Sequence, residues 1–137
     1  MIPTQQNILN AYSNVKLYVH RTPVLTSSYL DRLSGASLYF KCENFQKMGA
    51  FKMRGAVNAI QQLSEAQKQQ GVVTHSSGNF GQAVALAAKN LGIKAYVVMP
   101  NNAPSVKIEA VKGYGAEVIL CEPTLEAREH TSEAIVQ

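Results

Sequence analysis

Residues 72–92 read VVTHSSGNFGQAVALAAKNLG, and this stretch decides the fold. It begins with a β-rich run at 72–75, continues through small polar residues at 76–79, and becomes an alanine-rich segment at 80–91 that Gly92 ends. β-Branched residues favour a strand, small polar residues favour a turn, and glycine is a common stop for a helix. The stretch therefore predicts a strand, a turn and a helix in succession.

The same order of elements recurs downstream. A strand at 94–100 precedes a helix at 104–112 that glycines end, and a strand at 117–121 precedes a helix at 125–136. The strands start at residues 72, 94 and 117, so their starts are 22 and 23 residues apart. This spacing is close to the shortest that suits parallel strands, which need a crossover of roughly a dozen residues. The pattern predicts an α/β fold with a doubly wound parallel sheet.

The sequence before residue 72 is less regular. Its patterns predict a short helix around residues 8–12, a loop at Thr22-Pro23, a strand at 38–43, a turn at 44–49 and one amphipathic helix across 51–70 that Gly71 ends.

Composition places the chain among ordinary globular proteins. It has 137 residues, 46% of them hydrophobic and 16% charged. The net charge of +4 is spread without a basic run, which fits a small phosphorylated or carboxylate ligand and gives nucleic-acid binding no specific support.

Cysteines and histidines lack the spacing of a zinc site, so no metal site is expected. No apolar run approaches the roughly 20 residues of a membrane span, and no signal-peptide pattern opens the chain. We therefore expect a cytoplasmic protein without membrane contact.

The polar turn at 76–79 is a candidate anion site. Ser76, Ser77, Gly78 and Asn79 lie between a strand and the start of a helix, where free backbone N–H groups and the helix dipole favour negative charge. A plainer interpretation is a tight turn in which a serine or Asn79 caps the helix. The turn lacks the GxGxxG spacing, which disfavours a dinucleotide.

Lys52 is the second candidate, because it opens the helix predicted at 51–70, where a cation opposes the helix dipole. In an apolar setting a lysine is more readily the free amine that forms an imine with an aldehyde. A solvated surface lysine is the alternative, and the neighbouring Lys47 and Arg54 fit exposed charge.

A third group comprises Lys107, Lys112 and Tyr114, on or just after the helix predicted at 104–112. Lysines there are explained by helix capping. Tyr114 lies between two glycines, which permit a sharp bend that projects the ring into a ligand pocket or tucks it beneath the sheet.

Taken together, these residues resemble a known family. The run FKCENFQKMGAFKMRGA at 40–56, followed by SSGNFGQA at 76–83, is similar to the serine racemase and serine/threonine dehydratase family. These are fold-type II pyridoxal-phosphate enzymes, with a tryptophan-synthase-β-like fold. The resemblance extends from Thr22 to Ala116 and implies an enzyme that uses pyridoxal 5′-phosphate.

The resemblance also implies roles for individual residues. Lys52 is the expected covalent attachment point of the cofactor and a catalytic base, with Phe51 and Asn79 as further cofactor contacts. The expected binding residues for the substrate carboxylate are Ser76, Ser77, Asn79 and Phe80.

Ser77 bears on the reaction, because racemases of the family carry serine here whereas typical threonine dehydratases carry alanine. A base on each face of Cα implies serine racemisation with concurrent β-elimination to pyruvate and ammonia. Threonine/serine or 3-hydroxyaspartate ammonia-lyase activity is the alternative within the family. A non-catalytic ligand-binding fragment is the alternative outside it, and nucleic-acid binding ranks last.

Activation by ATP between subunits is a further implication. The matching positions are Ser27, Ser28, Tyr29, Lys47, Met48, Gln82, Lys107 and Tyr114. The resemblance implies Mg²⁺ as a second activator, with its ligands outside this chain, and a homodimer. Two positions depart from the family pattern, since Phe80 replaces a frequent histidine and Met48 replaces a threonine.

Family members are more than twice as long, and the last predicted helix runs into Gln137 without a stop signal. We therefore expect a truncated chain. Residues 1–70 are expected to be the N-terminal part of the large cofactor domain, and 71–137 the small α/β domain without its last part. Such a chain is expected to be weak or inactive by itself.

Overall fold

The computed structural model describes residues 2–137. Its helices and strands, in chain order, are α1 (Gln5–Val15), β1 (Val24–Leu25), α2 (Ser28–Ser34), β2 (Phe40–Lys41), the short 3₁₀ turns η1 (Glu43–Phe45) and η2 (Lys47–Gly49), α3 (Lys52–Gln61), α4 (Glu65–Gln70), β3 (Val72–His75), α5 (Asn79–Asn90), β4 (Ala95–Pro100), α6 (Ser105–Gly113), β5 (Glu117–Cys121) and α7 (Leu125–Val136).

The main sheet has the strand order β3-β4-β5, and both pairs of neighbours are parallel. This confirms the parallel α/β sheet predicted from the repeated pattern. β4 is the central strand, and its Val97, Val98 and Met99 are fully buried. A strand covered on both faces reads as a continuous apolar run, which is the reason its sequence lacks polar alternation.

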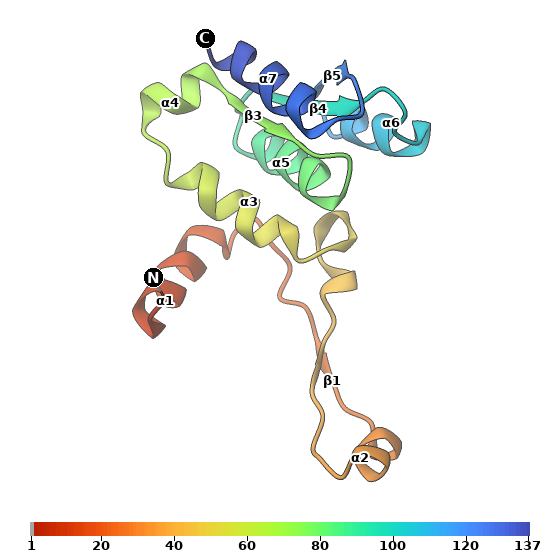
Figure 1. Cartoon of the computed structure of the whole chain (residues 1–137). Coiled ribbons are helices and arrows are strands. Elements are labelled where there is room, and N and C mark those ends of the chain that lie inside the picture. The colour runs from red at the N-terminus through yellow and green to blue at the C-terminus, as the bar shows by residue number, and fades with distance from the viewer. Residues whose placement is uncertain (1) are drawn as a thin grey trace.

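Helices cover both faces of this sheet. Val97 belongs to the core beneath α5, whereas Tyr96 faces the opposite side, where it lines a gap with Ile135 and Val136 of α7. Successive strand residues point to opposite faces, so α5 and α7 lie on opposite sides of the sheet (Figure 1). The sheet is doubly wound, as predicted.

The N-terminal part packs on the outer side of α5. α3 lies along α5, and α1 packs against α3 (Figure 1). Their shared core consists of Met53, Ala56, Val57 and Ile60 of α3 with Ala83, Ala87 and Ala88 of α5. Alanines at these positions let the helix axes approach closely, while Met53 and Val57 fill the space between them.

The antiparallel pair β1–β2 forms an arm that carries α2 away from the rest of the molecule (Figure 1). The strand predicted at 38–43 is shorter in the structure and comprises only Phe40–Lys41, because the chain turns into a 3₁₀ helix at Glu43.

The prediction of a single helix across 51–70 is wrong, because this segment forms two helices. α3 ends at Gln61, and α4 begins after Ser64, whose hydroxyl accepts a hydrogen bond from the backbone N–H of Gln67. The Gln67 side chain in turn accepts from the backbone N–H of Ser64, which completes a capping box. The predicted stop at Gly71 is confirmed, since this residue has φ +94°.

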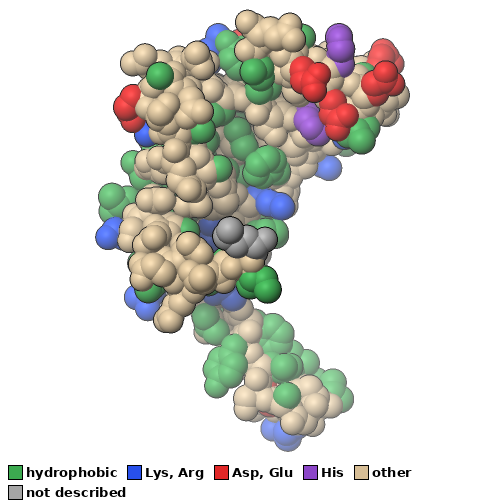
Figure 2. All heavy atoms as spheres, turned by 60° about the vertical axis from the view of Figure 1, so that its left-hand side comes forward, with side chains coloured by type: hydrophobic (Ala, Val, Ile, Leu, Met, Phe, Trp, Pro, Cys, Tyr) green, Lys and Arg blue, Asp and Glu red, His purple; other side chains and the backbone are tan. Residues whose placement is uncertain are grey.

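On the face drawn in Figure 2, acidic and histidine side chains gather at the upper end of the molecule, and lysine and arginine side chains lie mainly over the lower part. Between residues 2 and 137 no helix has the length and apolar character needed to cross a membrane. Over the same residues no cluster of histidine, cysteine and acidic side chains is suited to hold a metal ion.

Candidate functional site

The polar turn between β3 and α5 leaves the start of α5 open. Gly78 is the N-cap residue and is extended, and no side chain caps the helix. The Ser76 hydroxyl instead accepts a hydrogen bond of 3.3 Å from the Gly78 N–H. Among the described residues, the N–H groups of Asn79, Phe80 and Gly81 have no hydrogen-bond partner. The interpretation in which a serine or Asn79 caps the helix is wrong, and these amides are free to bind an anion.

Gly81 allows this turn to lie directly against the first turn of α5. A Cβ atom at residue 81 would lie 2.5 Å from the carbonyl oxygen of Ser76 and 3.1 Å from Cγ1 of Val97. Both distances are shorter than normal contacts, and the first involves backbone that cannot rotate away. Glycine is therefore needed here for the shape of the anion site.

Lys52 lies at the same end of the molecule as this turn. It is the first residue of α3 and is exposed, with Nζ 5.0 Å from the centroid of the Phe51 ring and 6.0 Å from that of Phe80. Phe80 belongs to the open first turn of α5, so the packing of α3 on α5 brings the lysine and the candidate anion site together. Two aromatic rings near an ammonium group stabilise its charge by cation–π attraction.

Arg54 is not the free surface charge that the sequence suggested. Its Nε donates to Oε2 of Glu43 at 2.9 Å and its Nη2 donates to Oε1 at 2.7 Å. The Thr22 hydroxyl donates a third hydrogen bond to this carboxylate, to its Oε1 at 2.6 Å. The hydrogen bonds from Arg54, with that from Thr22, lower the pKa of the Glu43 carboxyl to about 2, and the same ion pair raises the pKa of Arg54.

Gln46 is a second residue of this region that the sequence did not single out. It is 3% exposed, and its side-chain oxygen accepts from the backbone N–H groups of His20 and Lys47 while its Nε2 donates to the His20 carbonyl. The segment at 20–22 is thereby tied to the turn that precedes Lys52. A glutamine in an irregular turn has no periodicity to indicate burial, so no sequence signal marked it.

The predicted nucleotide residues lie on separate parts of the fold. Ser27 caps α2, and Ser28 and Tyr29 belong to that helix at the end of the arm. The remainder lie in η2 (Lys47, Met48), α5 (Gln82) and at α6 (Lys107, Tyr114). Within one chain the arm projects away from α6, so these residues do not converge (Figure 1). The Tyr114 ring packs partly buried against the core, and Lys112 pairs with Glu109 at 3.2 Å.

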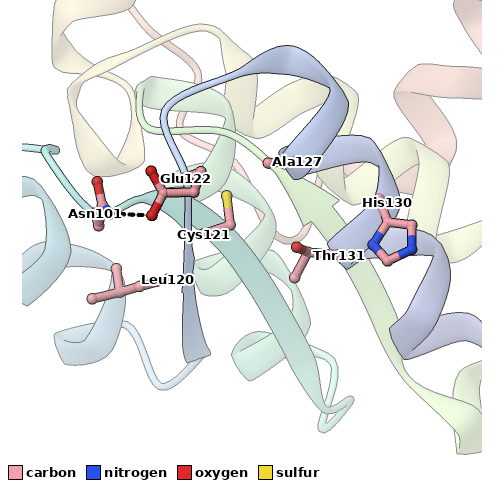
Figure 3. Close-up of a pocket in the computed structure, with 7 residues that line it drawn as sticks. All are labelled: Asn101, Leu120, Cys121, Glu122, Ala127, His130 and Thr131. Atoms are coloured by element: carbon pink, nitrogen blue, oxygen red, sulfur yellow. Dashed lines mark hydrogen bonds between the residues drawn. The ribbon is translucent and has the colours of Figure 1, made fainter.

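A separate surface hollow lies where β4 and β5 end against α7 (Figure 3). Its lining is Asn101, Leu120, Cys121, Glu122, Ala127, His130 and Thr131, and Asn101 Nδ2 donates to Glu122 Oε1 at 3.2 Å. None of the residues predicted for the site lines this hollow.

The fold and the site together define a class of protein. A lysine at the start of one helix lies beside a serine- and glycine-containing turn at the start of another, on a parallel α/β sheet. The model of the pyridoxal-phosphate dependent enzyme family matches residues 15–137, and the chain belongs to that family. The resemblance found in the sequence is thus confirmed at the level of the family and its fold.

Serine racemases are among the most similar relatives. The serine racemase of Dictyostelium discoideum is 53% identical over 134 residues, which are 98% of this chain and 41% of the relative. The β-hydroxyaspartate dehydratase of Paracoccus denitrificans is 49% identical, over 95% of this chain and 41% of the relative. The crystal structure of the Dictyostelium racemase superimposes with a TM-score of 0.93 over 97% of this chain and 43% of that one. This chain therefore spans about two fifths of the length of the relatives it matches.

Proposed function

We propose that this chain carries the lysine and the anion-binding turn of a pyridoxal-phosphate enzyme that racemises serine and also eliminates its β-hydroxyl to give pyruvate and ammonia. The observation that carries the proposal is the approach of Lys52 Nζ to Phe80, at the uncapped start of α5. The 53% identity to a serine racemase supports the choice of substrate class. In this proposal residues 1–70 belong to the large cofactor domain and 71–137 to the small one.

The residues present fit the cofactor. A primary amine, two aromatic rings and a row of free amides at a helix N-terminus are groups that suit an aldehyde-bearing aromatic phosphate and a carboxylate substrate. Lys52 would attach the cofactor, with Phe51 and Asn79 as further contacts. When bound, pyridoxal phosphate supplies an electron sink that makes the Cα–H of an amino acid acidic.

The protein's own part is to orient the amino acid and move its proton. The free amides of Asn79 and Phe80, with the hydroxyls of Ser76 and Ser77, would bind the substrate carboxylate. We assign proton transfer at Cα to Lys52 on one face and to Ser77 on the other. A base on each face permits either enantiomer to form, whereas one base favours loss of the β-hydroxyl.

The second candidate reaction is ammonia-lyase action on 3-hydroxyaspartate or threonine. It is favoured by the 49% identity to a β-hydroxyaspartate dehydratase. The two candidates separate in one assay, because racemisation converts L-serine to D-serine whereas the lyase releases ammonia from 3-hydroxyaspartate without forming a second enantiomer of serine.

The proposal includes activation of the enzyme by a nucleotide bound between two copies of the chain. Because Ser27, Ser28 and Tyr29 lie on the projecting arm and Lys107 lies on α6, a nucleotide that touched both sets would have to bridge two copies of the chain. We propose ATP as this ligand, Mg²⁺ as a further activator held by residues outside this chain, a homodimer as the assembly, and the cytoplasm as the location.

The test is to trap the cofactor with borohydride. The chain is incubated with pyridoxal phosphate, reduced, weighed intact by mass spectrometry and mapped by peptides. We expect one adduct at Lys52, and none at that position in Lys52→Ala or in the charge-conserving Lys52→Arg. Lys16→Ala, at another exposed lysine, is the matched control and should keep the adduct. Unchanged cofactor binding by Lys52→Ala would favour a non-catalytic ligand-binding role instead.

A further inference from the structure

The direction in which Lys52 points depends on the two residues that follow it. Successive residues of an α-helix are about 100° apart around its axis. Met53 is fully buried in the core with α5, and Arg54 is held by Glu43. Two anchors in different directions fix the orientation of the first turn of α3. The side that remains for Lys52 is the one that faces Phe80.

The anchor at Arg54 is stronger than an ordinary surface ion pair. Both oxygens of the Glu43 carboxylate accept hydrogen bonds from the same guanidinium, and such two-point pairs fix orientation as well as distance. Oε1 also accepts from Thr22, a residue that is 4% exposed, and Arg54 Nη2 donates to the His20 carbonyl at 3.3 Å. The pair is thus bound to the segment at 20–22.

The same carboxylate corrects an unfavourable charge arrangement. α3 has no acidic residue in its first turn and no side-chain cap, although Lys52 and Arg54 both lie at its positive end. Glu43, from a different segment, supplies the missing negative charge and neutralises Arg54. Lys52 is then the cation of this turn without a carboxylate partner among the described residues.

We propose that Glu43, acting through Arg54, is a positioning residue that holds the Lys52 amine beside Phe80 and the open start of α5. This inference rests on the proposed function, in which that amine attaches the cofactor. Loss of the pair releases the uncapped first turn of α3, while Ala56, Val57 and Ile60 still hold the rest of the helix on α5, so the amine moves away from the anion-binding turn.

The experiment compares Glu43→Gln and Arg54→Lys with the wild-type chain. Glu43→Gln keeps the size of the side chain but removes its charge, and Arg54→Lys keeps the charge but removes the two-point geometry. Glu65→Gln is the matched control, because it breaks the exposed Lys68–Glu65 pair far along the chain from Lys52. Thr22→Val removes one hydrogen bond to Glu43 and serves as a milder variant should the others fail to fold.

Two readouts are taken on folded protein well below its unfolding temperature. The first is the NMR signal of the Lys52 Hε protons, which the currents of the Phe51 and Phe80 rings shift. The second is the share of borohydride-trapped cofactor that maps to Lys52 rather than to other lysines. We expect the Lys52 signal to move toward its random-coil position and the share to fall at least about fivefold, with no change in Glu65→Gln.

Folded Glu43→Gln and Arg54→Lys variants with the wild-type Lys52 signal would overturn the positioning role. A wild-type chain that traps no cofactor at Lys52 would contradict the proposed function instead, while the NMR comparison would still decide whether Glu43 positions the lysine. The two failures are therefore distinguishable.

Discussion

The guanidinium of Arg54 holds both carboxylate oxygens of Glu43, with Nε 2.9 Å from Oε2 and Nη2 2.7 Å from Oε1. This contact joins the start of α3 to the turn at 43–45 and, through Thr22, to the base of the projecting arm. Three segments that are separate in the sequence meet at one carboxylate. The position of Lys52, two residues before Arg54, depends on this junction.

Stability should depend on the protonation of Glu43. The pKa of this carboxyl is lowered from its ordinary value of 4.5 to about 2, chiefly by hydrogen bonds from Arg54. A lowered carboxyl pKa stabilises the folded state above pH 4.5, and this stabilisation is lost as the pH falls from there toward 2. After allowance for solvent around the pair, we expect a loss of about 2 kcal/mol. Urea unfolding between pH 2 and 6 measures this loss. The part of the pH dependence of the unfolding free energy that comes from Glu43 should vanish in Glu43→Gln.

Gly81→Ala should damage both stability and the anion-binding turn. The new Cβ would lie 2.5 Å from the Ser76 carbonyl oxygen, so the turn or the helix must shift. We expect a loss of roughly 1–3 kcal/mol in the free energy of unfolding, measured in urea. Gly55→Ala is the control, because Gly55 lies inside α3 with open space around its Cβ position, and this change should stabilise by up to about 1 kcal/mol. Equal effects of the two substitutions would contradict the close approach.

The boundary between α3 and α4 should depend on Ser64. Its hydroxyl caps α4 and pairs with Gln67 in a capping box. We therefore expect Ser64→Ala to lower the free energy of unfolding by about 1 kcal/mol. Ser105→Ala, at the start of α6 where no side chain caps the helix, should change stability far less. The thermal unfolding of both variants is measured by circular dichroism. A Ser64→Ala variant as stable as the wild-type chain would argue for one continuous helix.

Ser77 should decide the balance between the two proposed reactions. In active enzyme that contains this chain, Ser77→Ala removes the base assigned to one face of Cα while Lys52 keeps the other. We expect the rate of L-serine to D-serine conversion to fall by about 10²-fold or more, with pyruvate formation retained. Chiral chromatography follows the first product and a coupled pyruvate assay the second. Parallel losses of both products would assign Ser77 to substrate binding alone.

Most of the α/β part was predictable because its elements are local and repeated. The strand starts at 72 and 117 were placed correctly by β-rich runs that precede turns and helices, and the helix at 80–91 matched α5 to within one residue at either end. The break between α3 and α4 was missed because the apolar spacing continues past the end of α3 to Leu63, although the Ser64-x-x-Gln67 spacing that starts α4 is a sequence signal for a new helix.

The sequence by itself determined the parallel α/β architecture, the identity of Lys52 as the unusual cation at a helix start, and the polar turn at 76–79, because each follows from residue types at short spacing. Only the tertiary structure decided that Lys52 meets Phe80, that Arg54 is bound by Glu43, and that Gln46 is buried. These contacts join residues of different segments, and their geometry is set by the packing of α3 on α5 and by the hydrogen bonds of the segment at 20–22. Local patterns carry no information about which distant partner a polar side chain finds.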